Sequence, residues 1–310
     1  MFVRRVLLLG LGLGLGCALV LLPAGQAGAT YPGTNGDIAF TSPSAAQTQI
    51  WTMAPLGGGK ALITSPPSAN FSPSWSADSS RIVFIATPPS GVQQIFMMNP
   101  NGTLRTQVTS GTRNFDDPSI SPDGKWIVAS SWRSDTESEN LWLVKADASR
   151  MHRFTKFKAD DVGATFSPDG TQVAWTRVRP NGTSDVFIKN VDGAGFHQLT
   201  GGNGDDRDAD FSPDGTKLVY THVEGIQETG RLWTMDVDGV HKARFTDNAS
   251  GTTYDAAVWS PKGDKVAFIR EVDLAHTVPD IFLVNYPGGG GFTNLTEGKF
   301  EPTDLDWGVG

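Results

Sequence analysis

The chain has 310 residues, with 25 Lys and Arg against 33 Asp and Glu, a net charge of −8 and a single Cys. This charge argues against a nucleic-acid-binding protein, which needs a clustered basic surface, and one Cys excludes an intramolecular disulfide framework and a Cys-based zinc site. The length allows either two average domains or one large all-β domain.

The first 29 residues have the pattern of a secretory signal peptide. Two arginines precede an apolar run over 6–22, and Ala27-Gly28-Ala29 matches the A-x-A cleavage pattern. We therefore expect cleavage after Ala29, which makes 1–29 a signal peptide and 30–310 a single domain with no membrane span. Two alternatives remain: an uncleaved signal anchor, because the apolar run is at the short end of a membrane span, and a lipoprotein linked through Cys17.

A repeat of about 45 residues follows the leader. Each unit starts with an S-P-D-G-type segment, such as 165–175, continues with a segment such as 231–235 (R-L-W-T-M), and ends in Thr, as at 244–246. The apolar residue before the first Ser of each unit, called the anchor here, recurs at Trp75, Ile120, Phe166, Phe211, Trp259 and Trp307. Short segments rich in β-branched and aromatic residues, separated by turn residues, predict strands. No stretch has the sustained 3.6-residue apolar period that would predict a helix.

Asp-Gly and Asn-Gly pairs separate the predicted strands, for example at 123–124, 169–170 and 101–102. Such pairs favour hairpin turns in which both central residues take positive φ. Each unit is therefore predicted to be a four-stranded antiparallel meander, and radial repetition of such units is typical of a β-propeller.

The repeat is out of phase with the chain ends. Five units are complete from Trp75 onward, whereas the sixth has its inner strand at 302–309 and its other three strands at 36–40, 49–53 and 62–64. Pairing the two ends within one blade would remove free sheet edges. The predicted fold is an all-β, six-bladed propeller closed in this way, and we expect a monomer.

The S-P-D-G turn, the L-W-T-M segment and the L-T ending resemble the WD40-like repeat of TolB-type six-bladed propellers, over about 275 residues. The resemblance implies the fold and much less about function. TolB itself carries an α/β domain before its propeller, whereas Thr30 here leads almost directly into the first predicted strand. Prolyl-oligopeptidase relatives add a serine hydrolase domain, but no G-x-S-x-G elbow is present. Oligogalacturonate lyases look like metal enzymes with histidine ligands, and the five histidines here are scattered.

Carboxylates gather in the connections that lead into the inner strands. Counted back from the anchor residue, they lie at −3 (Asp117, Asp208 and Asp304), at −4 (Asp116 and Asp255) and at −5 (Asp161 and Asp206). Five of six blades would thus bring an Asp to one mouth of the central tunnel; the blade with Asn70 and Ser72 is the exception.

Two interpretations of these carboxylates compete. They could bind a hard cation such as Ca²⁺, with Asp117, Asp208 and Asp304 as ligands, or equally a basic group of a partner. Alternatively, each Asp caps its own turn. Trp132 and Arg133, on a long loop of the same face, are expected to be exposed and to anchor a partner, since Trp and Arg are enriched at binding hot spots. No other cofactor is predicted.

No nucleophile–base arrangement, histidine cluster or phosphate-binding loop emerges from the sequence. We therefore expect an exported protein, periplasmic or secreted, that acts as a non-enzymatic module for binding a protein or envelope component. The alternative is a Ca²⁺-dependent propeller enzyme, a hydrolase, lactonase or lyase, that uses the Asp-lined mouth. A third hypothesis, glycan binding, depends on the aromatic residues Trp132 and Tyr254.

Overall fold

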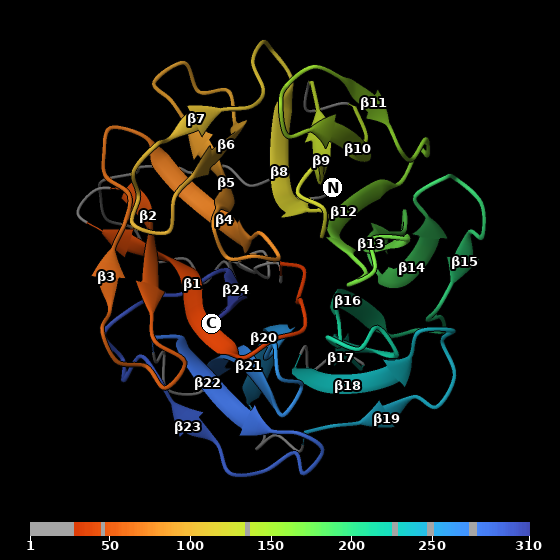
Figure 1. The fold of residues 1–310 in the computed structure, drawn as a ribbon. Coiled ribbons are helices and arrows are strands. Elements are labelled where there is room, and N and C mark those ends of the chain that lie inside the picture. The colour runs from red at the N-terminus through yellow and green to blue at the C-terminus, as the bar shows by residue number, and fades with distance from the viewer. Residues whose placement is uncertain (1–27, 45–46, 134–136, 225–228, 247–250, 273–277) are drawn as a thin grey trace, which may run out of the picture.

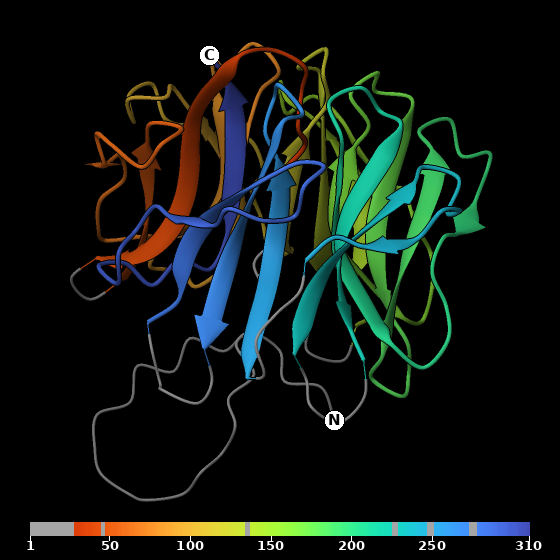
Figure 2. The same cartoon turned by 90° about the horizontal axis from the view of Figure 1, so that it is seen from below.

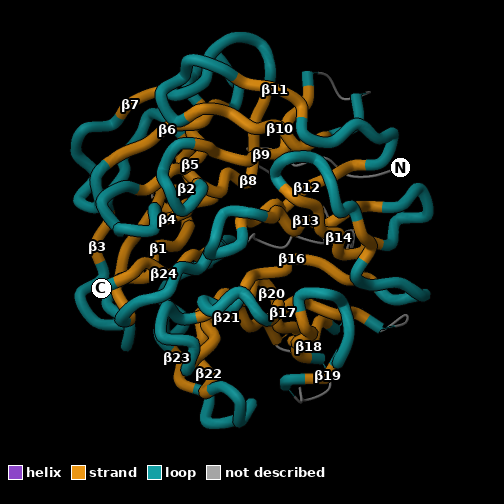
Figure 3. Tube along the Cα trace, turned by 45° about the vertical axis from the view of Figure 1, so that its right-hand side comes forward, coloured by secondary structure: helices purple, strands orange, loops and turns teal. Residues whose placement is uncertain are grey.

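The computed structural model describes residues 28–310 except 45–46, 134–136, 225–228, 247–250 and 273–277. The regular structure of these residues consists of strands, which form six four-stranded antiparallel sheets around a common centre (Figures 1 and 3). Nothing helical in the described part of the chain has the length and apolarity needed to cross a bilayer. The predicted six-bladed propeller is confirmed.

Each blade runs from an inner strand beside the tunnel to an outer strand at the rim. From inner to outer strand, the first blade is β24 (Leu305–Val309), β1 (Asn35–Ser44), β2 (Gln47–Met53) and β3 (Ala61–Leu62), and the second is β4 (Ala69–Trp75), β5 (Ile82–Thr87), β6 (Gln94–Met98) and β7 (Thr106–Gln107). The third blade is β8 (Asn114–Ile120), β9 (Trp126–Trp132), β10 (Asn140–Lys145) and β11 (Met151–Arg153), and the fourth is β12 (Asp160–Phe166), β13 (Gln172–Val178), β14 (Ser184–Asn190) and β15 (His197–Gln198). The fifth blade is β16 (Asp205–Phe211), β17 (Lys217–Val223), β18 (Gly230–Asp236) and β19 (Ala243–Arg244), and the sixth is β20 (Thr252–Trp259), β21 (Lys265–Val272), β22 (Asp280–Asn285) and β23 (Thr293–Asn294).

The first of these blades joins the two ends of the chain, as predicted. Strand β1 pairs with β2 on one side and with β24 on the other, so that Ile38 faces both Met53 and Trp307. The Trp307 indole N–H donates a 2.8 Å hydrogen bond to the Gly36 carbonyl, and its ring is fully buried. The C-terminal strand therefore supplies both a ladder and a core side chain to the closing blade.

The S-P-D-G turns differ in one detail from the prediction. In the turn at 121–124 only Gly124 has a positive φ, of 68°, and Asp123 does not. The Asp123 carboxylate instead accepts hydrogen bonds from the Ser121 hydroxyl (2.7 Å) and the Lys125 backbone N–H (3.0 Å). Because these bonds hold the turn by local capping, Asp123 does not need the left-handed conformation that the sequence pattern predicted.

The Thr that ends each repeat extends the pairing of a very short outer strand. The outer strands have only two or three residues. Immediately after them, the Thr hydroxyl accepts a hydrogen bond from a backbone N–H of the third strand, for example 2.9 Å from Ile95 to Thr109 and 2.9 Å from Ile281 to Thr296. The same contact occurs in all six blades.

Six buried apolar clusters occupy the six interfaces between neighbouring blades. Polar side chains reinforce these interfaces near the tunnel, because the residue before an anchor can accept a hydrogen bond from the anchor amide of the next blade. The Trp75 N–H donates to Asp306 (2.6 Å), and the Trp259 N–H donates to Asp210 (2.9 Å). Blade packing thus combines apolar burial with side-chain-to-backbone bonds across the interface.

The segment before β1 enters the ring. In Figure 1 this red part of the chain turns from β1 toward the centre. Ala29, Thr30 and Tyr31 are buried, and the Tyr31 hydroxyl donates a hydrogen bond to the Ile120 carbonyl of β8. The Thr30 hydroxyl lies 2.8 Å from Asp210 Oδ2 on β16 and 3.1 Å from the Trp259 carbonyl on β20. Residues 29–31 therefore contact the inner strands of three blades and fill part of the tunnel.

Candidate functional site

A β-bulge interrupts five of the six inner strands at the −3 position. The register shifts there by one residue in each hairpin, and the −3 residues have left-handed φ values: Ser72 49°, Asp117 47°, Gly163 61°, Asp208 55° and Ala256 49°. A bulge leaves its extra residue outside the ladder and bends the strand. The residues at −3 therefore lie outside the backbone ladder, at the tunnel mouth.

Side chains of adjacent blades meet at this level. The Ser72 hydroxyl of β4 lies 3.2 Å from Asp116 Oδ1 and 3.3 Å from Asp117 Oδ1 of β8. Asp117 is also close enough to Asp208 for its charge to raise the pKa of that carboxyl. Asp304, the sixth −3 residue, is buried and accepts a 3.0 Å hydrogen bond from the Thr303 hydroxyl.

Arg207 is a site residue that the sequence analysis missed. Its guanidinium lies 2.7 Å from Asp205 Oδ2, 3.0 Å from Asp255 Oδ2 and 3.6 Å from Asp208 Oδ2, and thus links β16 to β20. Two effects raise the pKa of Asp208 well above its ordinary value: burial, which is the larger, and the negative charge of Asp255. The positive charge of Arg207 lowers this pKa but does not outweigh them. Burial lowers the pKa of Arg207, but Asp255 and Asp208 outweigh it and raise that pKa overall.

The two aspartates at −5 do not join this group. Each faces the second strand of its own blade, where Asp161 is paired with Arg177 and Asp206 with His222 in the ladder register. Asp161 accepts bonds of 2.6 and 2.9 Å from the Arg177 guanidinium and 3.0 Å from the Trp175 indole. The guanidinium carbon lies 3.7 Å from the centre of the Phe157 ring. This ion pair is part of the packing between blades.

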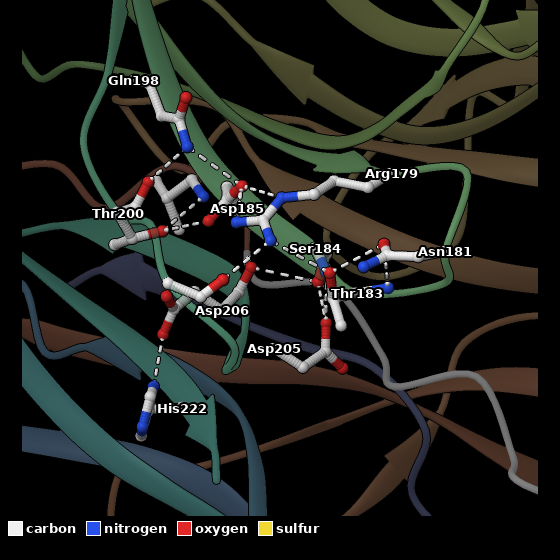
Figure 4. Close-up of polar contacts among 12 residues, drawn as sticks. Arg179, Asn181, Thr183, Ser184, Asp185, Gln198, Thr200, Asp205, Asp206 and His222 are labelled. Atoms are coloured by element: carbon white, nitrogen blue, oxygen red, sulfur yellow. Dashed lines mark hydrogen bonds and ion pairs between the residues drawn. The ribbon is translucent and has the colours of Figure 1, made fainter. Parts of the chain in front are cut away.

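A polar network surrounds Asp206 where β16 meets the loop between β13 and β14 (Figure 4). His222 Nδ1 lies 2.6 Å from Asp206 Oδ1, and the Asp206 carbonyl accepts a 3.1 Å bond from the Ser184 hydroxyl. In the same loop, Arg179 Nε donates a 2.5 Å bond to Asp185. These bonds fix the loop that borders the mouth, which sequence reasoning did not foresee.

Replacement of Asp206 by Asn is expected to shift the titration of His222. The hydrogen bond to Asp206 is the largest cause that raises the pKa of His222 above 6.5, so Asp206→Asn should return this pKa toward 6.5. The stability that the raised pKa contributes is complete below about pH 6.5 and is lost as the pH rises through the folded-state pKa.

NMR titration of the imidazole carbons measures this shift. His152, which lies in another blade, should have the same midpoint in wild type and variant. An unchanged His222 midpoint would show that Asp206 does not control its protonation.

The predicted loop anchors have mixed outcomes. Trp132 ends β9 opposite Asn114 and is half-buried, whereas Arg133 is exposed and its backbone N–H donates a 2.8 Å bond to Glu137. Tyr254 lies within β20 and is buried. The glycan-binding hypothesis needed an exposed ring at this position, so it is wrong for Tyr254.

The calcium site at Asp117, Asp208 and Asp304 stays a prediction. Within the described residues, no group of three or more His, Cys, Asp or Glu side chains is arranged to hold a metal ion. The side chains around Asp208 instead place a guanidinium among the carboxylates. The alternative that each Asp caps its own turn does not describe Asp161 or Asp206, which pair with Arg177 and His222. It does describe Asp116 and Asp255, each of which accepts a hydrogen bond from the backbone N–H of the next residue, at 2.9 and 3.2 Å.

Comparison with known proteins places these features in a family. Residues 136–301 match the family model described as the TolB beta propeller domain. A TolB homolog of Chlorobium luteolum is 27% identical over 152 residues, which are 49% of this chain and 34% of that protein. An uncharacterized protein of Agrobacterium fabrum is 26% identical over 219 residues, 70% of this chain and 60% of that protein. The chain therefore spans less than two thirds of the length of both relatives.

The fold is also similar to that of a solved structure. TolB from Acinetobacter baumannii superposes with a TM-score of 0.72 at 18% identity, over 88% of this chain and 66% of that one. At this identity the similarity concerns the fold alone.

Proposed function

This chain belongs to the TolB beta propeller family, and on that premise we propose that it is a non-enzymatic binding module that receives a positively charged segment of a partner protein at the Asp-lined tunnel mouth. The signal pattern over 1–29 supports export, to the periplasm or the surroundings of the cell, as the setting of this interaction.

The excess of carboxylates at the mouth carries this proposal. Among the described residues, the Arg207 guanidinium contacts three carboxylates, those of Asp205, Asp208 and Asp255. Three more, those of Asp116, Asp117 and Asp304, occupy the −3 or −4 position of other blades. Like charges held together at a partly dehydrated surface favour an approaching cation. A Lys or Arg of a partner would relieve this repulsion, as Arg207 already does within the protein.

The bulge places two of these carboxylates on residues with a strained backbone. Asp117 and Asp208 adopt left-handed φ values of 47° and 55°, a conformation that costs a non-glycine residue on the order of 1 kcal/mol or more. Gly163 has the equivalent position in the blade between them and adopts this conformation without a side-chain penalty. Ser72 and Ala256 adopt the same conformation, so the strain comes from the bulge, and Asp117 and Asp208 differ from these residues in placing a carboxylate at this position.

Neutralising the mouth should weaken binding of a basic peptide. We expect Asp117→Asn combined with Asp304→Asn to reduce affinity for a Lys- and Arg-rich peptide about tenfold, because two charges near the bound cation are lost. Fluorescence anisotropy measures this at low and at physiological salt, and the wild-type affinity should fall as salt screens the attraction.

A charge-matched variant provides the control. Asp192→Asn with Asp238→Asn removes two exposed carboxylates from turns on the opposite face. This variant should bind the peptide as the wild type does; equal losses in both variants would indicate attraction by net charge alone and would contradict a site at the mouth. Thermal melting with chelator and then with millimolar Ca²⁺ tests the calcium alternative, since a ligand of the folded state raises its stability.

A further inference from the structure

Two carboxylates meet the amino-terminal segment deep in the ring, below the level of the mouth. Asp210 of β16 and Asp306 of β24 are both completely buried. Asp210 Oδ2 accepts the bonds from Thr30 and Trp259, whereas Asp210 Oδ1 has no hydrogen-bond partner among the described residues. Asp306 accepts bonds from the backbone N–H groups of Trp75 and Trp307.

No described side chain supplies a positive charge that would match these carboxylates. In the part of the chain that the structure describes, no Lys, Arg or His forms an ion pair with Asp210 or Asp306. Burial raises the pKa of Asp306 to about 7 and that of Asp210 well above its ordinary value, and the charge of Asp306 adds to the shift at Asp210. A buried ionised carboxylate without a cation destabilises the folded state, so a cation bound between Asp210 and Asp306 would stabilise it.

Residues 28–30 run along both carboxylates. A Cβ atom built on Gly28 would lie 2.3 Å from Asp306 Cγ, so the chain passes directly against this side chain. Two residues later, the hydroxyl of Thr30 binds Asp210, and the backbone N–H of Thr30 also lowers the pKa of this carboxyl. The Thr30 nitrogen is therefore already directed at Asp210.

We propose that proteolytic processing between Ala29 and Thr30 creates the missing cation, and that the ring binds the new α-ammonium of Thr30 between Asp210 and Asp306. A leader peptidase hydrolyses the Ala29–Thr30 amide with one water: Ala29 leaves with a carboxylate, and the amide nitrogen of Thr30 becomes an ammonium. Removal of Gly28 and Ala29 also vacates the space beside Asp306. The tunnel is thus a binding site for the protein's own processed terminus, independent of what binds at the mouth.

The amino acid at this position suits the site. The hydroxyl of Thr30 already lies within hydrogen-bond distance of Asp210 and the Trp259 carbonyl. The next residue, Tyr31, binds β8 through its own hydroxyl. An α-ammonium has an ordinary pKa of about 7.7–8.0, and two adjacent carboxylates raise it. The terminus therefore remains charged at neutral pH, and the ion pair fastens the segment inside the ring.

The first test uses a reaction specific to an amino-terminal Thr. The full chain is produced with its own leader in an exporting bacterium, and the purified protein is sequenced from its amino terminus; we expect Thr30. Periodate cleaves the 1,2-amino alcohol that only a free amino-terminal Ser or Thr presents. Oxidation should be at least about tenfold slower in the native protein than in urea, because a buried group reacts only after opening. A different amino-terminal residue, or equal oxidation rates, would overturn the proposal.

The second test removes the charge of Asp210 without its shape. In Asp210→Asn the remaining side-chain oxygen can still accept the Trp259 N–H, so the bond between blades is kept. The processed variant should melt about 5–8 °C lower than wild type, since a buried ammonium loses its partner, and native-state oxidation of Thr30 should accelerate. Asp192→Asn, exposed in a turn, is the control and should change neither value. Unchanged oxidation in Asp210→Asn would also contradict the proposal, and if the variant does not fold, the wild-type oxidation rates decide.

Discussion

Removal of residues 302–310 is expected to abolish the cooperative folding of the propeller. These residues form β24, which completes the first blade and pairs with β1 from Phe40↔Leu305 to Asn35↔Val309. Their loss exposes the edge of β1, removes the buried Trp307 ring from the cluster that joins the last blade to the first, and removes the Asp306 carboxylate that binds the Trp75 N–H.

The expected loss is comparable to the whole stability of a domain. Truncating one buried Trp costs about 3–5 kcal/mol, and the lost ladder adds to this, whereas domains are stable by only about 5–15 kcal/mol. Circular dichroism and calorimetry should show either no cooperative transition or one far below that of wild type. A protein with six extra residues after the exposed Gly310 is the control and should melt normally. A truncated protein that melts cooperatively at the wild-type temperature would refute closure through β24.

Replacement of Asp161 by Asn is expected to destabilise the propeller by about 3–5 kcal/mol, because the buried Arg177 guanidinium then lacks its counter-charge. The pair is bidentate and almost inaccessible to solvent, with side-chain exposures of 9% for Arg177 and 0% for Asp161. Asn keeps the volume of Asp and an oxygen for the Trp175 indole, so the loss reports mainly the missing charge.

A double variant separates the charge effect from packing. Asp161→Asn with Arg177→Met leaves no unpaired guanidinium, and Met retains apolar contact with Phe157 and Phe187, whose ring centres lie 3.7 and 4.6 Å from the guanidinium carbon of Arg177. We expect the double variant to be more stable than Asp161→Asn alone by chemical denaturation. If the double variant loses as much free energy of unfolding as Asp161→Asn and Arg177→Met lose together as single variants, or more, the two residues do not act as a buried ion pair.

The blade count and ring closure were predictable from sequence because both depend on order along the chain. The anchor residues recur with the strands, and the phase offset assigns 302–309 to the first blade regardless of side-chain contacts. The shared position of the Asp residues at −3 was also visible in the sequence, because each occupies the same place in its repeat. The bulges at Asp117 and Asp208 could not be predicted, since strand alternation predicts continuous pairing and a bulge appears only in the ladder between two strands.

The partners of the carboxylates could not be predicted by counting acidic residues. Asp161 and Asp206 face Arg177 and His222 because the bulge shifts the hairpin register, and each pair is directly opposite in that shifted register. Arg207 lies at −4, between two aspartates of the sequence, so its position was visible. Its role required the neighbouring blade, since the bond to Asp255 joins residues 48 positions apart.

The blade that contains both ends of the chain also sets the order of folding. Blades two to six each consist of one continuous stretch and can form local hairpins, whereas β1 needs residues 305–309, which follow all the other blades in the sequence. Contacts of such long sequence separation form slowly, so the ring stays open until β24, dark blue beside the red β1 in Figure 2, pairs with β1. Pairing of β24 with β1, rather than formation of any of blades two to six, is the event that closes the ring.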